Sequence, residues 1–128
     1  TSAALRHRAE RGIHPCGPAP YGFRRDRHAP GELVIHEAEA EVIKLAFELY
    51  SATSMLADRA AFTASAIRYR DVQVPKESIT PRLVARVLRS PAVAGLVRVP
   101  GTDEMVEAAF PAIVGRRRFA HVAAMLGG

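Results

Sequence analysis

The chain has 128 residues, of which 48% are apolar, so we expect one folded domain with a single core and not a disordered segment. No apolar run approaches the ~18 residues of a membrane span, and we expect neither a signal peptide nor a membrane partner. The one cysteine, Cys16, excludes an internal disulfide and a thiolate-rich zinc site, and favours a cytoplasmic location. Because the first residue is Thr, we expect a piece of a longer protein.

The positive charge comes from arginine and is unevenly distributed along the chain. The net charge is +5, with sixteen Arg and two Lys. Residues 1–28 carry a net +4, residues 29–58 a net −5, and residues 59–100 a net +6. Arginine binds phosphate and the guanine edge through two parallel hydrogen bonds. Two basic regions separated by an acidic one suggest two surfaces for a polyanion, and an ordinary solvated basic surface is the alternative.

The N-terminal region combines the end of a helix, an irregular loop and a hairpin. Residues 3–11 predict the end of a helix, which Gly12 terminates. Three prolines exclude regular structure in residues 14–20. The segments "YGFRR" and "ELVIH" flank "DRHAPG", a pattern that predicts a short β-hairpin.

A strong helical pattern covers residues 37–50. Its apolar residues share one face: Val42, Ile43, Ala46, Phe47 and Tyr50. Three carboxylates stand near its start, where the positive end of the helix dipole favours them: Glu37, Glu39 and Glu41. We interpret them as helix-start residues that face solvent, and not as an acid pair or a metal site.

The rest of the chain predicts two more helices, a second hairpin and a final helix. Residues 55–70 have a helical stripe, and a loop follows. Thr80 and Pro81 form a good helix start, and this helix extends to about Arg89. Residues 94–110 predict a hairpin that turns at Pro100 and Gly101, and residues 115–128 contain the last helix. The expected fold is α+β and mainly helical, with about four helices and two short β-hairpins around a helix-turn-helix-like core.

The helix over residues 80–89 is the strongest candidate for a DNA contact. At about 100° per residue, Arg82, Arg86 and Arg89 lie within about 60° of one another. The apolar residues lie on the opposite side, so one face can pack while the other presents three guanidinium groups and Thr80. A helix-turn-helix pair presents such a face to the major groove. An ordinary amphipathic surface helix is the alternative.

The sequence contains no catalytic constellation. No glycine-rich phosphate loop is present, and the serines have no positioned base. The five histidines are scattered and lack paired ligand spacing, so we interpret each as a surface or DNA-facing residue: His7, His14, His28, His36 and His121. The chain is therefore predicted to have no catalytic residue, no metal site and no cofactor, and not to be an enzyme by itself.

Several motifs in order resemble the recombinase domain of large serine recombinases, a family that includes phage integrases and serine-type resolvases. The motifs are "RAERGIHPCGPAPYGFR", "GELVIHEAEAEVIKLAFELY", "ITPRLVARVLRSPAVAGLV" and "FPAIVGRRRFAHVAAML", and they extend from about Arg8 to Leu126. "PYGF" and "LRSPAVAG" are fairly specific in combination. Val93 stands where the family usually has an aromatic residue, and Ile79 where a Trp is frequent.

The resemblance implies a DNA-binding domain. Residues 1–12 would be the end of a linker helix and residues 13–128 the DNA-binding domain. The segment that joins the linker helix to the rest of the domain would lie along the minor groove, anchored by Tyr21 and Phe23. Its arginines would bind phosphates: Arg8, Arg11, Arg24 and Arg25. The expected partners are double-stranded DNA at an attachment or resolution site and an upstream catalytic domain of the same chain, in a dimer or tetramer of bacterial or phage origin.

Two other kinds of protein remain as alternatives to a recombinase domain. A protein-interaction domain would use the basic faces for an acidic partner, and a small helical transcription regulator would use them for an operator. A resolvase-type catalytic domain upstream would identify the recombinase.

Overall fold

The computed structural model describes residues 19–26, 28, 32–53 and 58–126, and within them it has the predicted mainly helical α+β architecture. Its four helices are α2 (Glu37–Ala52), α3 (Arg59–Arg68), α4 (Pro81–Leu88) and α5 (Arg116–Met125). Two antiparallel strand pairs join β1 (Phe23–Arg25) to β2 (Leu33–Ile35) and β3 (Leu96–Arg98) to β4 (Met105–Glu107). Two 3₁₀ turns, η1 (Lys76–Ser78) and η2 (Pro91–Ala94), flank α4. The predicted helix over residues 3–11 lies outside the described residues.

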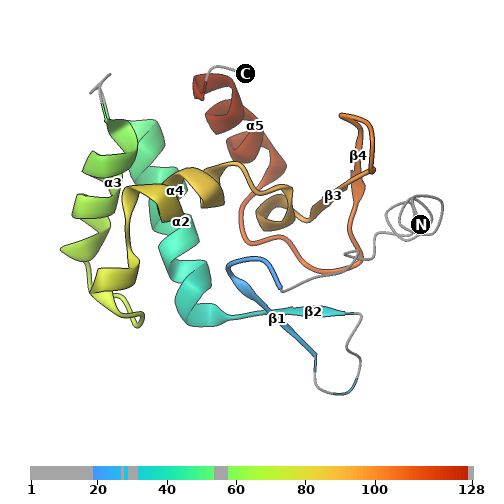
Figure 1. Ribbon diagram of the computed structural model, residues 1–128, viewed down its shortest axis with the longest axis horizontal. Coiled ribbons are helices and arrows are strands. Elements are labelled where there is room, and N and C mark those ends of the chain that lie inside the picture. Colours follow the sequence, from blue (N-terminus) through green and yellow to red (C-terminus); the bar gives the residue numbers. More distant parts are fainter. Residues whose placement is uncertain (1–18, 27, 29–31, 54–57, 127–128) are drawn as a thin grey trace.

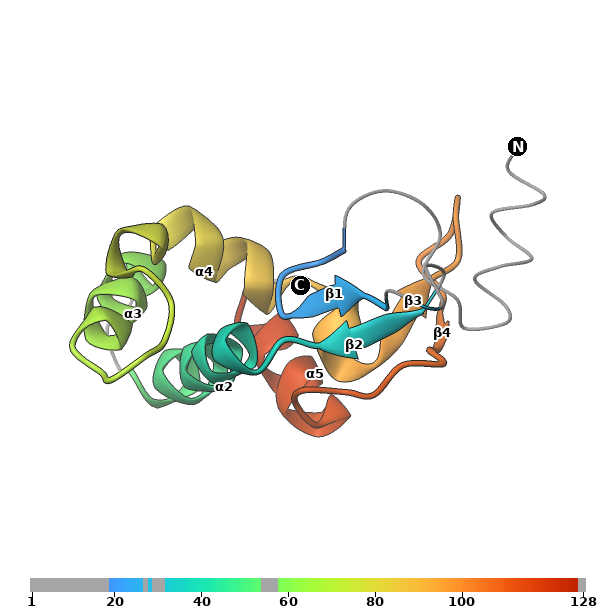
Figure 2. The same ribbon diagram turned by 90° about the horizontal axis from the view of Figure 1, so that it is seen from below.

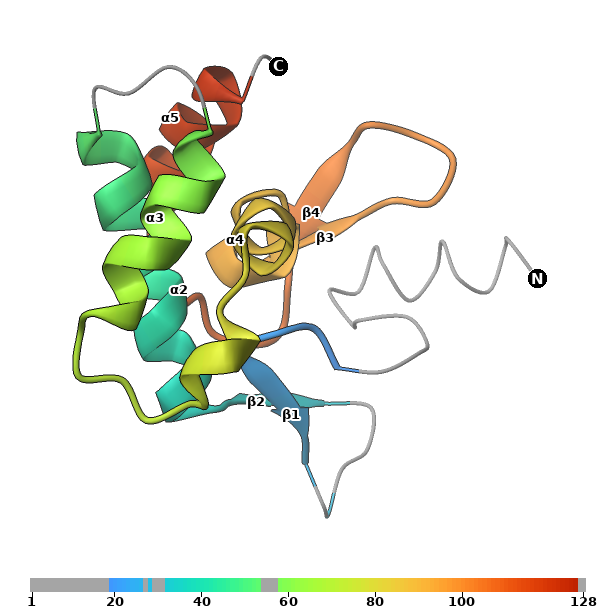
Figure 3. The same ribbon diagram turned by 60° about the vertical axis from the view of Figure 1, so that its left-hand side comes forward.

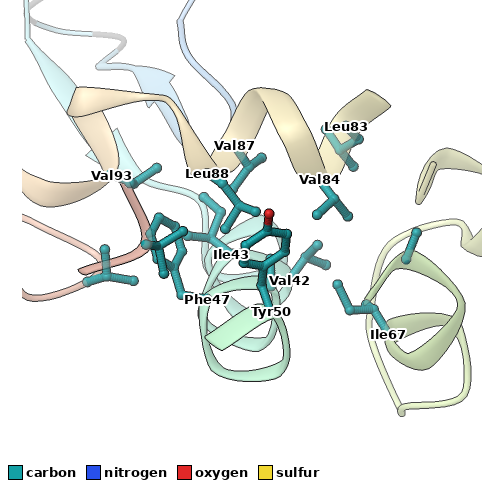
Figure 4. Packing of buried hydrophobic residues seen from close by; sticks show 14 of the residues in the cluster. Val42, Ile43, Phe47, Tyr50, Ile67, Leu83, Val84, Val87, Leu88 and Val93 are labelled. Carbon is teal, nitrogen blue, oxygen red and sulfur yellow. The ribbon is translucent and has the colours of Figure 1, made fainter. Parts of the chain in front are cut away.

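The helices α2, α3 and α4 gather at one end of the molecule and the strand pairs at the other (Figures 1 and 2). Apolar side chains of the three helices meet in the main core, which also includes residues of α5 (Figure 4). The predicted apolar faces of residues 37–50 and 80–89 are both buried in this core. No helix in the described part of the chain is long and apolar enough to cross a membrane.

A second, smaller core joins the two hairpins. Phe23 of β1 is fully buried and packs edge-on against Phe110, with ring centroids 5.1 Å apart. Leu33, Val97 and Val99 complete this cluster. Val93 and Ile79, which replace the aromatic residues usual in the resembled family, are fully buried in the main core. Aliphatic side chains therefore fill these two positions.

The connection between α3 and α4 is longer than the three to four residues of a simple helix-turn-helix turn. It contains η1, and its end is held by a hydrogen bond from the Arg68 guanidinium to the Ile79 carbonyl oxygen. The next residue, Thr80, caps α4. The connection between α3 and α4 therefore differs from a simple helix-turn-helix turn, and the Arg68 hydrogen bond positions the start of α4.

The helix ends follow local signals with one exception. Thr80 and Pro81 start α4 as predicted, and the Thr80 hydroxyl oxygen accepts the Leu83 N–H at 3.1 Å. The start of α2 at Glu37 is also as predicted. Its cap is His36, whose Nδ1 accepts the Glu39 N–H at 3.3 Å. His36 is partly exposed, and its ring also completes the start of α2, a role that the sequence did not predict.

Candidate nucleic-acid interface

The outer face of α4 presents the three arginines that the sequence placed together. Arg82, Arg86 and Arg89 are exposed, while the opposite side of the helix is buried against α2 and α3: Leu83, Val84, Val87 and Leu88. The N-terminal end of α4 carries the exposed residues Thr80 and Arg82. An outer face with three guanidinium groups and no carboxylate is suited to bind a polyanion.

Gly22 joins the arm, defined here as residues 19–22, to the helical core. Its φ of 99° lies in a region that residues with a side chain rarely adopt. Its N–H donates to Glu39 Oε1 at 2.9 Å, and its carbonyl oxygen accepts the His36 N–H at 2.8 Å. Both hydrogen bonds attach the arm to the start of α2. The "PYGF" motif therefore forms a tight junction in which a glycine is required.

Glu39 holds Arg24 as well as Gly22. The two guanidinium nitrogens Nη1 and Nη2 of Arg24 donate to the two carboxylate oxygens of Glu39, each at 2.8 Å. The Glu39 side chain is only 14% exposed. The interpretation of Glu39 as a solvent-facing residue was wrong, whereas Glu37 and Glu41 are exposed as expected. Arg24 was expected to bind a phosphate. In the structure both of its terminal guanidinium nitrogens donate to Glu39.

The Glu39 carboxylate should make stability depend on pH. Burial raises the pKa of Glu39, but the hydrogen bonds from Arg24 and from the Gly22 N–H outweigh burial, and the net pKa is below the ordinary value. A lowered folded pKa stabilises the protein above the unfolded pKa, and this stabilisation is lost as the pH falls through the folded pKa. We expect Glu39→Gln to lower the free energy of unfolding by about 1 kcal/mol at neutral pH.

Urea unfolding of both proteins across the acid range measures this effect. The difference between wild type and Glu39→Gln should shrink as the pH falls below the ordinary carboxyl range. The matched control is Glu41→Gln, an exposed residue of the same helix, which should change stability by less than about 0.5 kcal/mol. A pH-independent difference for Glu39→Gln would contradict the role of its charge.

Two pockets that share Pro20 and Ser90 lie beside the arm and the C-terminal end of α4, and together we call them the arm groove. Its first part, about 460 Å³ in volume, is lined by arm residues, by the Arg24–Glu39 pair, and by Arg86, Val87 and Ser90. Its second part, about 220 Å³, shares Pro20 and Ser90 with the first and ends at Arg98 of β3. The arm passes beside the C-terminal end of α4 (Figure 2), and a view along the axis of α4 shows the arm on the side of this helix that faces β1 and β2 (Figure 3). The arm groove thus connects α4 to the second hairpin.

Tyr21 lines the first part of the arm groove. Its hydroxyl is buried and has no hydrogen-bond partner in the described structure. Burial and then the Glu39 carboxylate raise the pKa of Tyr21, so the hydroxyl stays protonated at neutral pH. Tyr21 therefore borders the groove as a neutral aromatic side chain.

The structure brings together only part of the predicted set of site residues. Arg82, Arg86, Arg89 and Thr80 share the outer side of α4, and Arg25 is half-buried in β1. Arg8 and Arg11 lie outside the described residues. Sequence reasoning missed Arg98 and Ser90, which reach the groove only through folding, although Arg98 in an otherwise apolar strand was a visible signal. The described residues contain no group of three or more metal-binding side chains.

The comparisons with known proteins agree with this fold. A crystal structure of an LSR–DNA complex matches 98% of this chain and 40% of that chain, with a TM-score of 0.74 and 16% identity. A structure described as "Sequence Requirements of the Listeria innocua prophage attP site" matches 98% of this chain and 50% of that chain, with a TM-score of 0.70 and 15% identity. The chain thus spans half or less of these chains. No curated protein matches it significantly.

The family model described as Recombinase matches residues 37–128, from the start of α2 to the last residue. This match covers most of the chain, and the fold agrees with it independently. The resemblance to the recombinase domain of large serine recombinases is confirmed, and the chain belongs to the recombinase family.

Proposed function

We propose that the chain is a DNA-binding domain of a site-specific serine recombinase. The observation that carries this proposal is the outer face of α4, where three exposed arginines oppose a fully packed apolar side. The family membership and the likeness to a chain solved in an LSR–DNA complex support it. The N-terminal end of a recognition helix reads base edges in the major groove, and Arg82 occupies that end of α4.

The proposed role of the domain is positional. It docks on half of an attachment or resolution site and holds an upstream catalytic domain at the crossover point, in a dimer or tetramer on DNA. Residues 1–12 act as the end of the linker helix and residues 13–128 as the DNA-binding domain. Strand cleavage and rejoining belong to the catalytic domain of the parent protein.

Replacing Arg82 should relax the preference for one base pair. An arginine that forks onto guanine contributes about 1–3 kcal/mol of discrimination, so Arg82→Ala should lose roughly 5- to 150-fold of selectivity at that position. The measurement selects the preferred duplex from a randomised pool with the wild-type chain. It then compares the binding of wild type and variant to that duplex and to its single-base-pair substitutions.

Arg117→Ala, an exposed arginine of α5, is the matched control and should keep the wild-type preference. If Arg82→Ala weakens binding to all duplexes equally, α4 contacts only the DNA backbone and the recognition-helix role is wrong. If the wild-type chain selects no DNA but binds an acidic protein, the protein-interaction alternative replaces the proposed function.

A further inference from the structure

The arm groove is lined by more positively charged side chains than negatively charged ones. Among the described residues that line it, Glu39 is the one acidic residue, and Arg24 neutralises Glu39 through two hydrogen bonds. Arg86 has no partner in the described part of the chain. Two guanidinium groups, Arg86 in the first part and Arg98 in the second, therefore line the groove as available cations.

The ion pair of Arg98 does not remove it from this role. Its partner is Asp103, at 3.5 Å from Nη1 to Oδ1, and that carboxylate is fully exposed. Exposed pairs of this kind contribute about 0–1 kcal/mol, so an incoming anion can replace Asp103. Arg98 also lies between two hollows, since it lines the arm groove and a second pocket that contains Arg89.

The walls of the groove suit a chain of sugars and phosphates better than an isolated anion. Apart from its charged residues and Ser90, the groove is lined mostly by apolar side chains, which include Pro20, Val87 and Leu96. Ser90 lies in the middle, and its hydroxyl makes no hydrogen bond to the described residues. Apolar walls accept the faces of sugar rings, while arginines and a hydroxyl bind phosphate oxygens.

We infer that the arm groove binds the backbone of one DNA strand, with Arg86 and Arg98 on phosphates of that strand and Ser90 as a further contact. This inference rests on the proposed function and adds two contact residues, Ser90 and Arg98, and a path for the strand. It also divides the arginines of α4 by task. Arg82 reads a base, and Arg86, turned toward the arm, holds the backbone. The β3–β4 hairpin becomes part of the DNA-binding surface through Arg98.

The test compares Arg86→Gln and Arg98→Gln with the control Arg117→Gln, all in the 128-residue chain. Binding to the preferred duplex and to a scrambled duplex is measured across a salt series. Each groove variant should lose affinity equally on both duplexes and should reduce the slope of log affinity against log salt by about one unit. The control should keep the wild-type slope, and thermal unfolding of each variant verifies its fold.

A second measurement places the contact on the DNA. Single phosphates of the preferred duplex are replaced by neutral methylphosphonates, one position at a time. The position that weakens wild-type binding but leaves Arg98→Gln binding unchanged is the phosphate that Arg98 holds. The same experiment with Arg86→Gln should identify another phosphate of the same strand, because the two pockets that contain these arginines share Pro20 and Ser90.

The outcomes separate the two proposals. If the wild-type chain binds DNA and both groove variants bind like wild type, the groove inference is wrong and the proposed function stands. A groove variant that relaxes base preference, or coupled phosphates on different strands, also overturns the inference. If the wild-type chain binds no duplex even at low salt, the proposed function fails and the inference fails with it.

Discussion

In low salt the chain should bind duplex DNA, and its affinity should fall about 10³- to 10⁵-fold between ~50 and ~200 mM salt, the loss expected for roughly six to ten phosphate contacts. The cause is the release of counterions from each phosphate that a guanidinium neutralises. The candidates for these contacts are the arginines of the outer face of α4, Arg98 of the arm groove, and the arginines that the sequence analysis assigned to phosphates: Arg8, Arg11 and Arg25. Binding titrations at four or five salt concentrations measure the slope.

The control for this prediction is a second duplex whose sequence is unrelated to the preferred one. A duplex of unrelated sequence should show a similar slope with lower affinity, because backbone contacts do not depend on sequence. A flat salt response, or no binding at the lowest salt concentration, would contradict a nucleic-acid partner and favour an acidic protein partner or none. The same titrations supply the wild-type baseline for Arg86→Gln and Arg98→Gln.

Replacing Gly22 by alanine should destabilise the domain more than the same substitution at Gly101 or Gly115. A methyl group at this position would lie 2.4 Å from Ile43 Cδ1 and 2.9 Å from Ile113 Cδ1, and the φ of 99° adds backbone strain. Strain and overpacking together should lower the free energy of unfolding by about 2–5 kcal/mol. Urea unfolding of the purified variant measures the loss.

Two other glycines separate these causes. Gly101 has a φ of 79° and open space around it, so Gly101→Ala should lose only the strain, about 1–2 kcal/mol. Gly115 has an ordinary φ of −69° and open space, so Gly115→Ala should change stability by less than about 0.5 kcal/mol. Equal losses for Gly22→Ala and Gly101→Ala would contradict the close approach to Ile43.

A double mutant tests the contact directly. Ile43→Val removes the Cδ1 atom nearest to the new methyl group and by itself should lose about 0.5–1.5 kcal/mol. Combined with Gly22→Ala, it should lose less than the sum of the two single losses, because the clash that it relieves is shared. Strict additivity would show that the two positions do not interact.

Local signals allowed much of the fold to be predicted. Thr80 and Pro81 identify a helix start because capping involves only neighbouring residues, and the apolar spacing of residues 37–50 identifies a buried face because helical periodicity is local. The same periodicity predicted the outer arginines of α4. It did not predict the length of α3, which begins at Arg59 after residues that lie outside the described structure.

The functional surface was only partly predictable, as Glu39 illustrates. Its position near the start of a helix is sufficient to explain a carboxylate there. The sequence therefore did not indicate its hydrogen bonds to Gly22 and Arg24, which are 17 and 15 residues away in sequence. The cap of α2 was hidden in the same way, since a histidine is not among the usual capping residues.

The sequence by itself determined the elements, their buried faces and the arginine side of α4, because each depends on residues within a few positions of one another. Only the tertiary structure decided what lies beside that side of α4. The junction at Gly22 brings the arm against the end of α4, and η2 brings Arg98 to the same groove. Periodicity states which face of an element is buried but not which element covers it, so contacts between distant segments appear only when the core has formed.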